Sequence, residues 1–232
     1  MYARVKDFLL RRLEGPLRYA RELSTALTER RLNIETRHSD SGPGARPNLP
    51  DYRGIYSDRA VYDDNVYYEP LEYRNVRGIF RVFDLGRDDV FYDIGCGKGR
   101  VLCLVARLPL RKVVGVELFD ELCEAARQNA GRLRGRKSPI EIICADATKV
   151  DYSDATVFYW WNPFGEQTMR GVIQRIRESF DKNPRSIRIG YLKPVHHYVL
   201  DEETWLERYA SIKTVTGSTM VFWRTVASPA SR

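Results

Sequence analysis

The sequence lacks any uninterrupted apolar run as long as the ~18 residues that a membrane-spanning helix needs. Its N-terminus, MYARVKDFLLRRLEGP, carries charges inside the apolar stretch and therefore lacks the apolar core of a secretory signal. These two absences predict a protein that stays in the cytoplasm and does not associate with a membrane.

Cysteine and histidine are scarce. The four cysteines are Cys96, Cys103, Cys123 and Cys144, and no two of them stand at the two-residue spacing of a metal or redox motif. Two of the three histidines, His196 and His197, are adjacent, with no acidic partner in register. We therefore expect reduced cysteines and no metal site.

Acidic residues are fewer than basic ones, 31 against 38, which gives a formal net charge of +7. The segment Gly131–Lys137 has four basic residues and no acidic ones. Such a patch permits an acidic protein or a nucleic acid as a partner, although a solvated surface explains it more simply.

Residues 2–31 have the pattern of two amphipathic helices, which Gly15–Pro16 separates because proline kinks a helix interior. Their apolar faces are Val5, Phe8, Leu9 and Leu13, then Leu17, Ala20, Leu23 and Leu27. We expect these faces to pack against the rest of the chain or against a second subunit, which permits a homodimer, in preference to a membrane surface.

Strand and helix patterns alternate after Asp88. The expected strands are residues 88–95, 112–117, 140–146, 155–161 and 186–192, and the expected helices are 98–107, 119–134 and 166–182. Segments near 211–216 and 219–226, joined by Gly217–Ser218, read as a closing hairpin. This alternation predicts an α/β fold with a doubly wound, mostly parallel sheet, whose ligands bind beyond the carboxyl ends of the strands.

A glycine-rich loop, Asp93-Ile-Gly95-Cys-Gly97-Lys-Gly99, follows the first of these strands and precedes a helix. A dinucleotide-binding loop would need glycine at position 100, which is Arg100, and a P-loop would need Ser or Thr after the lysine. Asp93 would also repel a pyrophosphate. S-adenosylmethionine has no phosphate and carries an ammonium and a sulfonium, so an acid beside the loop suits it.

Two further acids stand at the ends of the next strands. Glu117 is placed to accept hydrogen bonds from both ribose hydroxyls of a nucleoside, and Asp146 from the adenine amine, with small Ala147 letting the ring lie close. Each acid alone has a simpler explanation as a helix cap or a surface residue. Three acids in series behind a glycine loop favour a nucleoside cofactor.

Asp93–Gly99, Glu117 and Asp146–Ala147 together resemble the cofactor motifs of the class I, seven-strand methyltransferases. The resemblance implies that Asp93, Gly95, Gly97, Gly99, Glu117, Asp146 and Ala147 bind S-adenosyl-L-methionine. It also implies the strand order 3-2-1-4-5-7-6, with the last strand antiparallel.

The fourth strand ends in Asn162-Pro163-Phe164. An asparagine side chain and a proline-restricted carbonyl offer two acceptors for an amine, and Asn162 would also lie beside the cofactor. Trp160, Trp161 and Phe164 could form an aromatic wall beside a cation. The alternative is that Asn162 caps the next helix and that the aromatic residues belong to the core.

Residues 157–180 and the later Ile189–Pro194 resemble the corresponding stretches of the disruptor-of-telomeric-silencing type of histone lysine methyltransferases. Upstream, Tyr67–Pro70 resembles the tyrosine segment that closes over the cofactor in that group. The resemblance implies that Tyr68 and Glu69 contact the methionine end of the cofactor or the amine, with Tyr68 among the catalytic residues. Asn-Pro followed by an aromatic residue also resembles the four-residue motif of amino-methylating nucleic-acid and protein-glutamine enzymes.

The expected organisation has four parts. They are an N-terminal helical extension and linker (1–50), a tyrosine-rich lid and helix (51–87), the methyltransferase core (88–227) and a disordered tail (228–232). The helix of the second part has the apolar face Val76, Ile79, Phe80 and Phe83.

Four functions stay open at this stage. The first is an enzyme that methylates an amine of a protein, with lysine favoured. The second is a small-molecule methyltransferase in which the N-terminal parts form the lid. A nucleic-acid methyltransferase ranks lower because the sequence has no recognisable RNA or DNA module. A cofactor-binding module without catalysis is disfavoured by the intact acids.

Overall fold

The computed structural model describes residues 19–37 and 71–226 of the chain. Its centre is one seven-stranded sheet. The strands are β1 (Val90–Ile94), β2 (Lys112–Glu117), β3 (Ile140–Cys144), β4 (Val157–Trp161), β5 (Arg188–Leu192), β6 (Leu206–Lys213) and β7 (Thr219–Thr225).

The strands lie in the order β3-β2-β1-β4-β5-β7-β6. The first five are parallel, and β7 runs antiparallel to both β5 and β6. The expected order and the mostly parallel, doubly wound sheet are therefore confirmed. Because β1 to β5 run the same way, the loops that follow them meet at one edge of the sheet.

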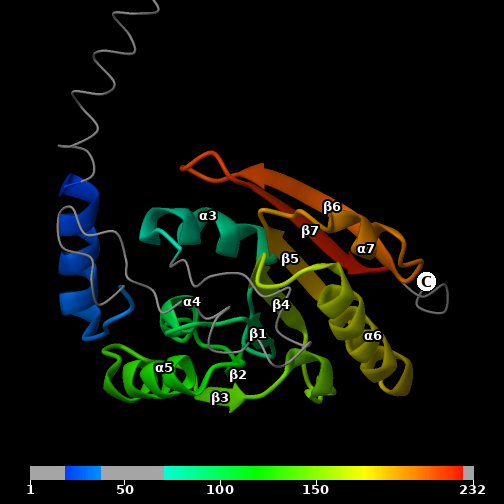
Figure 1. Cartoon of the computed structure of the whole chain (residues 1–232), viewed down its shortest axis with the longest axis horizontal. Helices are drawn as coiled ribbons and strands as arrows, with labels where there is room; N and C mark the ends of the chain where they lie inside the picture. The colour runs from blue at the N-terminus through cyan, green and yellow to red at the C-terminus, as the bar shows by residue number, and fades with distance from the viewer. Residues whose placement is uncertain (1–18, 38–70, 227–232) are drawn as a thin grey trace, which may run out of the picture.

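Helices cover both faces of this sheet (Figure 1). They are α3 (Tyr73–Phe83), α4 (Arg100–Val105), α5 (Asp120–Arg132), α6 (Glu166–Lys182) and α7 (His197–Asp201), and a 3-10 turn, η1 (Ala147–Lys149), follows β3. A further helix covers residues 19–32. Figure 1 shows α3, α4 and α5 on one side of the sheet and α6 on the other.

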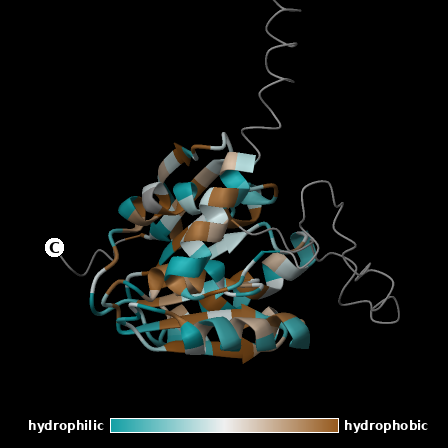
Figure 2. Ribbon diagram, turned by 90° about the vertical axis from the view of Figure 1, so that its left-hand side faces the viewer, coloured by the Kyte–Doolittle hydropathy of each residue, from teal (hydrophilic) through white to brown (hydrophobic). Residues whose placement is uncertain are grey.

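Each face of the sheet has its own hydrophobic core. On one face, α6 buries Met169, Val172, Ile173 and Ile176, whose spacing follows the helix repeat. On the other face, α3, α4 and α5 pack over Phe91 and its neighbours. Figure 2 shows the strands as largely hydrophobic, while the helices alternate between hydrophobic and hydrophilic residues. This double cover holds the strand ends, and therefore the site, in fixed positions.

The helix at residues 19–32 does not pack as its apolar pattern predicts. Leu23 and Leu27 are 47% and 57% exposed, whereas Leu32 and Ile34 near its end are buried in the core. The Leu23–Leu27 face therefore does not pack against the described rest of the chain, which is one of the two expected ways of covering it. Packing against a second subunit stays a prediction.

The C-terminal part differs from the expected pattern in two places. Strand β6 begins at Leu206, earlier than the hairpin pattern indicates, and the short helix α7 precedes it. Strand β6 lies at the edge of the sheet, and buried and exposed residues alternate only weakly along it. Its sequence therefore lacks the clear alternation of apolar and polar residues that marks a strand. Among the described residues, no helix is long and apolar enough to span a membrane.

Candidate active site

The candidate site lies where the loops after β1 to β5 meet. Asp93 is on β1, Glu117 ends β2 and Asn162 directly follows β4. We call the loops after β1, β2 and β3 the cofactor side, and the loops after β4 and β5 the acceptor side. Tyr68 and Glu69 lie outside the described residues, so their predicted contacts stay predictions.

The glycine loop is bound to the end of β2 by backbone hydrogen bonds. The amides of Gly95 and Cys96 donate to the carbonyl of Val116, at 2.8 and 3.1 Å. Gly95 and Gly99 have φ values of 74° and 77°, in the left-handed region that disfavours any residue with a Cβ. The glycines therefore allow a tight turn that leads straight into α4.

Asp93 is a buried acid without a hydrogen-bonded partner. Its side chain is 3% exposed, and no donor among the described residues reaches the carboxylate. Burial raises the pKa of Asp93 well above its usual 3.8, and the nearby Glu117 carboxylate raises it further. The hydroxyl of the neighbouring Tyr159 is also buried without a partner. A cation placed here would satisfy a group that the fold leaves unpaired.

Glu117 is also buried, but backbone amides surround it. Its Oε2 accepts from Gly97 at 2.8 Å, and its Oε1 accepts from Leu118 and Phe119 at 2.9 and 3.2 Å. Burial raises the pKa of Glu117, and these three amides partly offset that effect. Of about four acceptor positions on a carboxylate, one on Oε2 is left for a ligand hydroxyl. The predicted contact with two ribose hydroxyls would therefore require an amide to be shared or displaced.

Asp146 has the capping role that its simpler explanation predicts. Its Oδ1 accepts from the amide and the hydroxyl of Thr148, at 2.9 and 2.7 Å, and so begins η1. Its Oδ2 lies 3.8 Å from the ammonium of Lys149. The cap and the predicted adenine contact are compatible because they involve different oxygens. Ala147 packs at the margin of the core.

The acceptor side touches the glycine loop at one point. A Cβ atom built on Gly95 would lie 2.6 Å from Cβ of Pro163, so the two residues are in direct contact. The Asn162–Pro163 turn and the glycine loop, which are far apart in the sequence, therefore form one continuous wall. This contact is what brings the predicted cofactor and acceptor residues together.

Asn162 does not cap α6. The N-cap of that helix is Gly165, without a side-chain cap, and Asn162 adopts a φ of 39°, which asparagine tolerates better than most residues. Its Oδ1 instead accepts a 2.6 Å hydrogen bond from the hydroxyl of Tyr191 on β5. Tyr191 is a residue of the candidate site that the sequence analysis missed, because this pairing exists only once β5 lies beside β4.

The aromatic residues of this region divide into two groups. Trp160 and Phe164 are 0% and 4% exposed and belong to the core under α6, so they do not form the expected wall. Trp161 is half-buried, and the ammonium of Lys193 lies 4.8 Å from its ring centroid. Trp161 is therefore the member of the expected wall that stands at the site, and its ring face already holds a cation.

A polar chain extends from the acceptor side towards solvent. The amide of His196 donates to the Tyr191 hydroxyl at 3.3 Å, and His196 Nδ1 lies 3.2 Å from the hydroxyl of Tyr198. Tyr198 in turn donates to Glu166 at 2.7 Å. Hydrogen bonds from Tyr198 and Arg170 lower the pKa of Glu166. The outer end of the acceptor side is thus polar, and Glu166 there is ion-paired with Arg170 at 2.8 Å.

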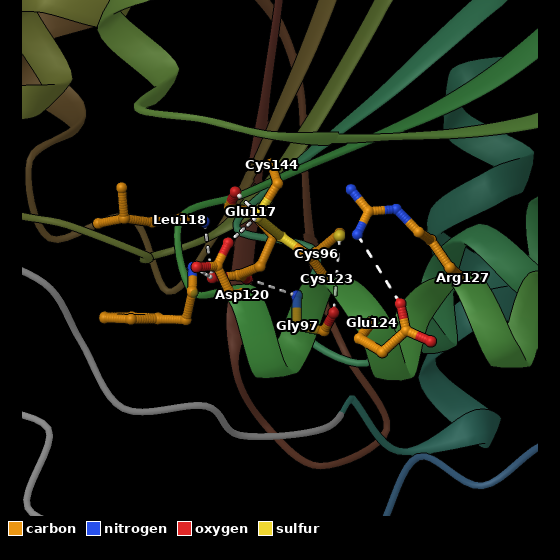
Figure 3. Close-up of a disulfide and its surroundings, with 10 residues drawn as sticks. Cys96, Gly97, Glu117, Leu118, Asp120, Cys123, Glu124, Arg127 and Cys144 are labelled. Atoms are coloured by element: carbon orange, nitrogen blue, oxygen red, sulfur yellow. Dashed lines mark hydrogen bonds and ion pairs between the residues drawn. A yellow bond between two sulfur atoms is a disulfide. The ribbon is translucent and has the colours of Figure 1, made fainter.

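The expectation that all cysteines are reduced is wrong. Cys123 on α5 and Cys144 at the end of β3 form a disulfide, with their Cα atoms 5.8 Å apart (Figure 3). The strand β2, helix α5 and strand β3 form one crossover unit that returns β3 beside β2, so residues separated by 21 positions meet. Cys96 and Cys103 are free and buried. Spacing along the sequence could not reveal this pair.

The disulfide lies directly beside Glu117, as Figure 3 shows. Sγ of Cys123 is 3.4 Å from the Glu117 carbonyl oxygen, and Sγ of Cys144 is 3.2 Å from the Asp120 carboxylate. Both sulfurs are bonded to each other, so these are contacts and not S–H hydrogen bonds. The crosslink joins helix α5, which follows β2, to the end of β3 on the cofactor side.

A buried ionic network fastens the N-terminal segment to the helix that follows the glycine loop. Glu29 and Arg100 are 2% and 4% exposed, and their side chains lie 3.2 Å apart. Arg100 also donates to the hydroxyl of Thr36 and to the carbonyl of Leu71. Its guanidinium stacks over the ring of Tyr73 at 4.6 Å.

The same segment holds the glycine loop itself. The side-chain amide of Asn129 donates to the carbonyls of Glu35 and Lys98, at 2.9 Å each. The ammonium of Lys98 donates to the carbonyl of Arg37. The described part of the N-terminal extension therefore contributes to the shape of the cofactor side, which its sequence pattern did not indicate.

Comparison with known proteins agrees with this geometry. Residues 91–182, which contain the glycine loop, both strand-end acids and Asn162, match the family model described as "Methyltransferase domain". Over these residues the chain is similar to methyltransferase domains, and its strand order is the one expected for the class I fold. A protein-lysine N-methyltransferase of Saccharolobus islandicus (strain REY15A) is 35% identical over 99 residues, which cover 41% of this chain and 60% of that protein. The match thus spans about three-fifths of that relative's length.

Solved structures share the fold of this methyltransferase domain. An RNA methyltransferase from Salinibacter ruber, bound to S-adenosyl-L-homocysteine, superposes with a TM-score of 0.53 at 22% identity and covers 71% of this chain and 98% of its own. A SAM-dependent methyltransferase from Aquifex aeolicus gives 0.52 at 11% identity, with 66% and 90% covered. S-adenosyl-L-methionine is the cofactor of this fold, and the unpaired Asp93 carboxylate beside the glycine loop fits its cationic groups.

Proposed function

We propose that this protein transfers the methyl group of S-adenosyl-L-methionine to the side-chain amine of a lysine in another protein. The observation that carries the proposal is the contact between Pro163 and Gly95. It puts Asn162, whose side chain can accept a hydrogen bond from an amine, against the loop that would hold the cofactor.

The electrostatics of the two sides support an amine acceptor. Burial and the charge of Glu117 raise the pKa of Asp93, and the ammonium of the cofactor, which carries its methyl group on a sulfonium, would favour the ionised carboxylate when it binds beside it. Asn162 Oδ1 has one lone pair left after its bond from Tyr191 and can accept one N–H of an incoming amine. A neutral carboxamide orients the amine without fixing a charge on it.

The transfer is an in-line displacement. The amine lone pair forms a bond to the methyl carbon while the bond between that carbon and sulfur breaks, and the bonding electrons stay on sulfur. The methylated ammonium then gives its extra proton to solvent. Asn162 and the Pro163 turn contribute by orienting the nitrogen, and such orientation supplies much of the rate gain in reactions of this kind.

A lysine must lose its proton before the transfer, because an ammonium has no lone pair. The half-buried ring of Trp161 and the nearby Lys193 ammonium make the entrance poorly solvated and positive, which disfavours a second ammonium there. Similarity to a relative named for protein lysine, together with the resemblance of residues 157–180 to a histone lysine group, favours this acceptor over a small molecule.

The test is transfer of a labelled methyl group from S-adenosylmethionine into a whole-cell lysate. Protein, nucleic-acid and small-molecule fractions are separated, and the protein is hydrolysed to amino acids. We expect the label in methylated lysine. A lysate whose lysines have been acetylated beforehand is the control and should take up little label. Label confined to nucleic acid or to small molecules, or to another amino acid, would refute the lysine assignment.

A further inference from the structure

The hydroxyl of Tyr191 stands between two turns of the acceptor side. Its residue is fully buried on β5, in register with Trp160 of β4, so the ring position is fixed by the sheet. Strands β4 and β5 are each followed directly by a residue with positive φ and then a proline, Asn162-Pro163 and Lys193-Pro194. The Tyr191 hydroxyl donates a hydrogen bond to Asn162 in the first turn, and it accepts one from the amide of His196 just after the second.

The hydrogen bonds of Tyr191 determine which way the Asn162 carboxamide points. The amide of His196 donates to the Tyr191 oxygen at 3.3 Å, so that oxygen acts as an acceptor on that side. Its own proton then goes to Asn162, 2.6 Å away, and the atom that faces it must be Oδ1. Burial raises the pKa of Tyr191, which keeps the hydroxyl protonated and able to donate.

The orientation of that carboxamide matters for an amine. The last torsion of an asparagine side chain has a broad, roughly two-fold profile, so without a partner the oxygen and the NH₂ group can exchange places. With the oxygen fixed, an incoming amine meets an acceptor for its N–H. In the reversed orientation the NH₂ group would donate to the amine lone pair, which is the pair that must attack the methyl carbon.

We propose that Tyr191 is a positioning residue that fixes the Asn162 carboxamide with its oxygen available to an acceptor amine. The effect on catalysis rests on the proposed function. The fixed orientation of the Asn162 side chain does not depend on it. Tyr191 touches neither the cofactor nor the reacting atoms in this role. It acts through Asn162 alone, and this makes a specific test available.

The first experiment is a double-mutant cycle with Tyr191→Phe and Asn162→Ala, in which purified histones are the lysine-containing acceptor. Tyr191→Phe should lower kcat about 10- to 100-fold, which is the loss of rate expected when an orienting group is misplaced. The Kd of S-adenosylmethionine should stay within about twofold. In the Asn162→Ala background the same change should alter kcat by less than about twofold. An equal loss in both backgrounds would show a structural effect and overturn the proposal.

Tyr92→Phe is the matched control. Tyr92 is buried on β1 and donates a 2.8 Å hydrogen bond to Asp154, before β4 and therefore away from the acceptor side. This variant loses a comparable bond, so kcat should stay close to that of the unmodified protein. Thermal unfolding of all variants establishes that each is folded during the kinetic measurements.

The second experiment does not depend on activity. The side-chain NH₂ of Asn162 is assigned in a ¹⁵N spectrum by its absence from Asn162→Ala, and its order parameter is measured by relaxation. We expect a rigid amide in the unmodified protein and in Tyr92→Phe, and a mobile one in Tyr191→Phe. Equal rigidity in all three would overturn the proposal. If the lysate experiment yields no methylated lysine, the proposed function fails, and this measurement still decides the role of Tyr191.

Discussion

The cofactor side and the acceptor side share one edge of the sheet but are held by different kinds of contact. On the cofactor side, buried Glu117 lies among backbone amides, and the Cys123–Cys144 disulfide ties helix α5 to the end of β3. On the acceptor side, the main contact is between side chains, from Tyr191 to Asn162, and the polar chain beyond it reaches solvent.

The difference matches what each side has to bind. A cofactor of constant shape can be bound largely by backbone groups, whose positions change little when side chains are substituted. An acceptor-specific surface needs side chains that evolution can exchange. Pro163 lies against Gly95, where the two sides meet. Substitutions on the two sides should therefore separate cofactor binding from turnover, and the predictions below test that separation.

The largest expected effect is on the acceptor side. Asn162→Ala removes the acceptor for the amine N–H, and we expect kcat to fall by about a thousandfold, or ~4 kcal/mol of transition-state stabilisation. The Kd of S-adenosylmethionine, measured by calorimetry, should change little because no contact on the cofactor side is lost. A variant that keeps full turnover, or that loses cofactor binding to the same degree, would contradict the separation.

The next effect concerns the anchor of the cofactor side. Glu29→Ala leaves the guanidinium of Arg100 buried without its carboxylate, and breaking a buried pair costs roughly 3–5 kcal/mol of unfolding free energy. Because Arg100 begins the helix after the glycine loop, cofactor affinity should fall as well. Denaturant unfolding with and without S-adenosylmethionine measures both.

Glu178→Ala is the control for that change. Glu178 pairs with Arg175, and both side chains are 40% exposed, so the loss should stay within about 1 kcal/mol. If Glu29→Ala were as mild as Glu178→Ala, the N-terminal segment would not be an anchor of the site.

Reduction of the disulfide should have a smaller effect. The disulfide joins Cys123 and Cys144, which are 21 positions apart in the sequence. Closing a loop of that length stabilises a folded protein by about 3 kcal/mol. For a chain of this size that is a fall in Tm of roughly 6–12 °C on addition of a reductant. The double variant Cys123→Ala, Cys144→Ala should have a low Tm that no longer responds to reductant. A reductant-insensitive Tm in the unmodified protein would argue against the crosslink.

The sequence could predict the fold and most of the cofactor side because those features are local. The glycine loop, Glu117 and Asp146 each lie at the end of a strand or within two residues of it, and a strand-helix alternation has few ways to fold. Tyr191, Arg100 and the disulfide escaped prediction because each depends on a partner 20 or more residues away. Trp160 and Phe164 were expected at the site and lie in the core, since aromatic residues look alike in both settings.

The last prediction concerns Asp93, where binding and stability should change in opposite directions. Asp93→Asn keeps the shape of the side chain but removes the charge that the cofactor ammonium needs. Charge-assisted hydrogen bonds are worth roughly 1.5–3 kcal/mol, so the Kd of S-adenosylmethionine should rise about 10- to 100-fold. Calorimetry measures this, and Asn162→Ala, which should bind normally, is the reference.

Without cofactor the same variant should be the more stable protein at neutral pH. Burial and the charge of Glu117 raise the pKa of Asp93 above its usual 3.8, so the folded state holds that proton more tightly than the unfolded chain does. The free energy of unfolding of the unmodified protein therefore falls as the pH rises from about 4 through the raised pKa, and this decline should be weaker in Asp93→Asn. The expected gain is at neutral pH, and near pH 3 the two proteins should be about equally stable. A loss of stability at neutral pH would mean that Asp93 is well paired in the folded protein and is not held in readiness for a cation.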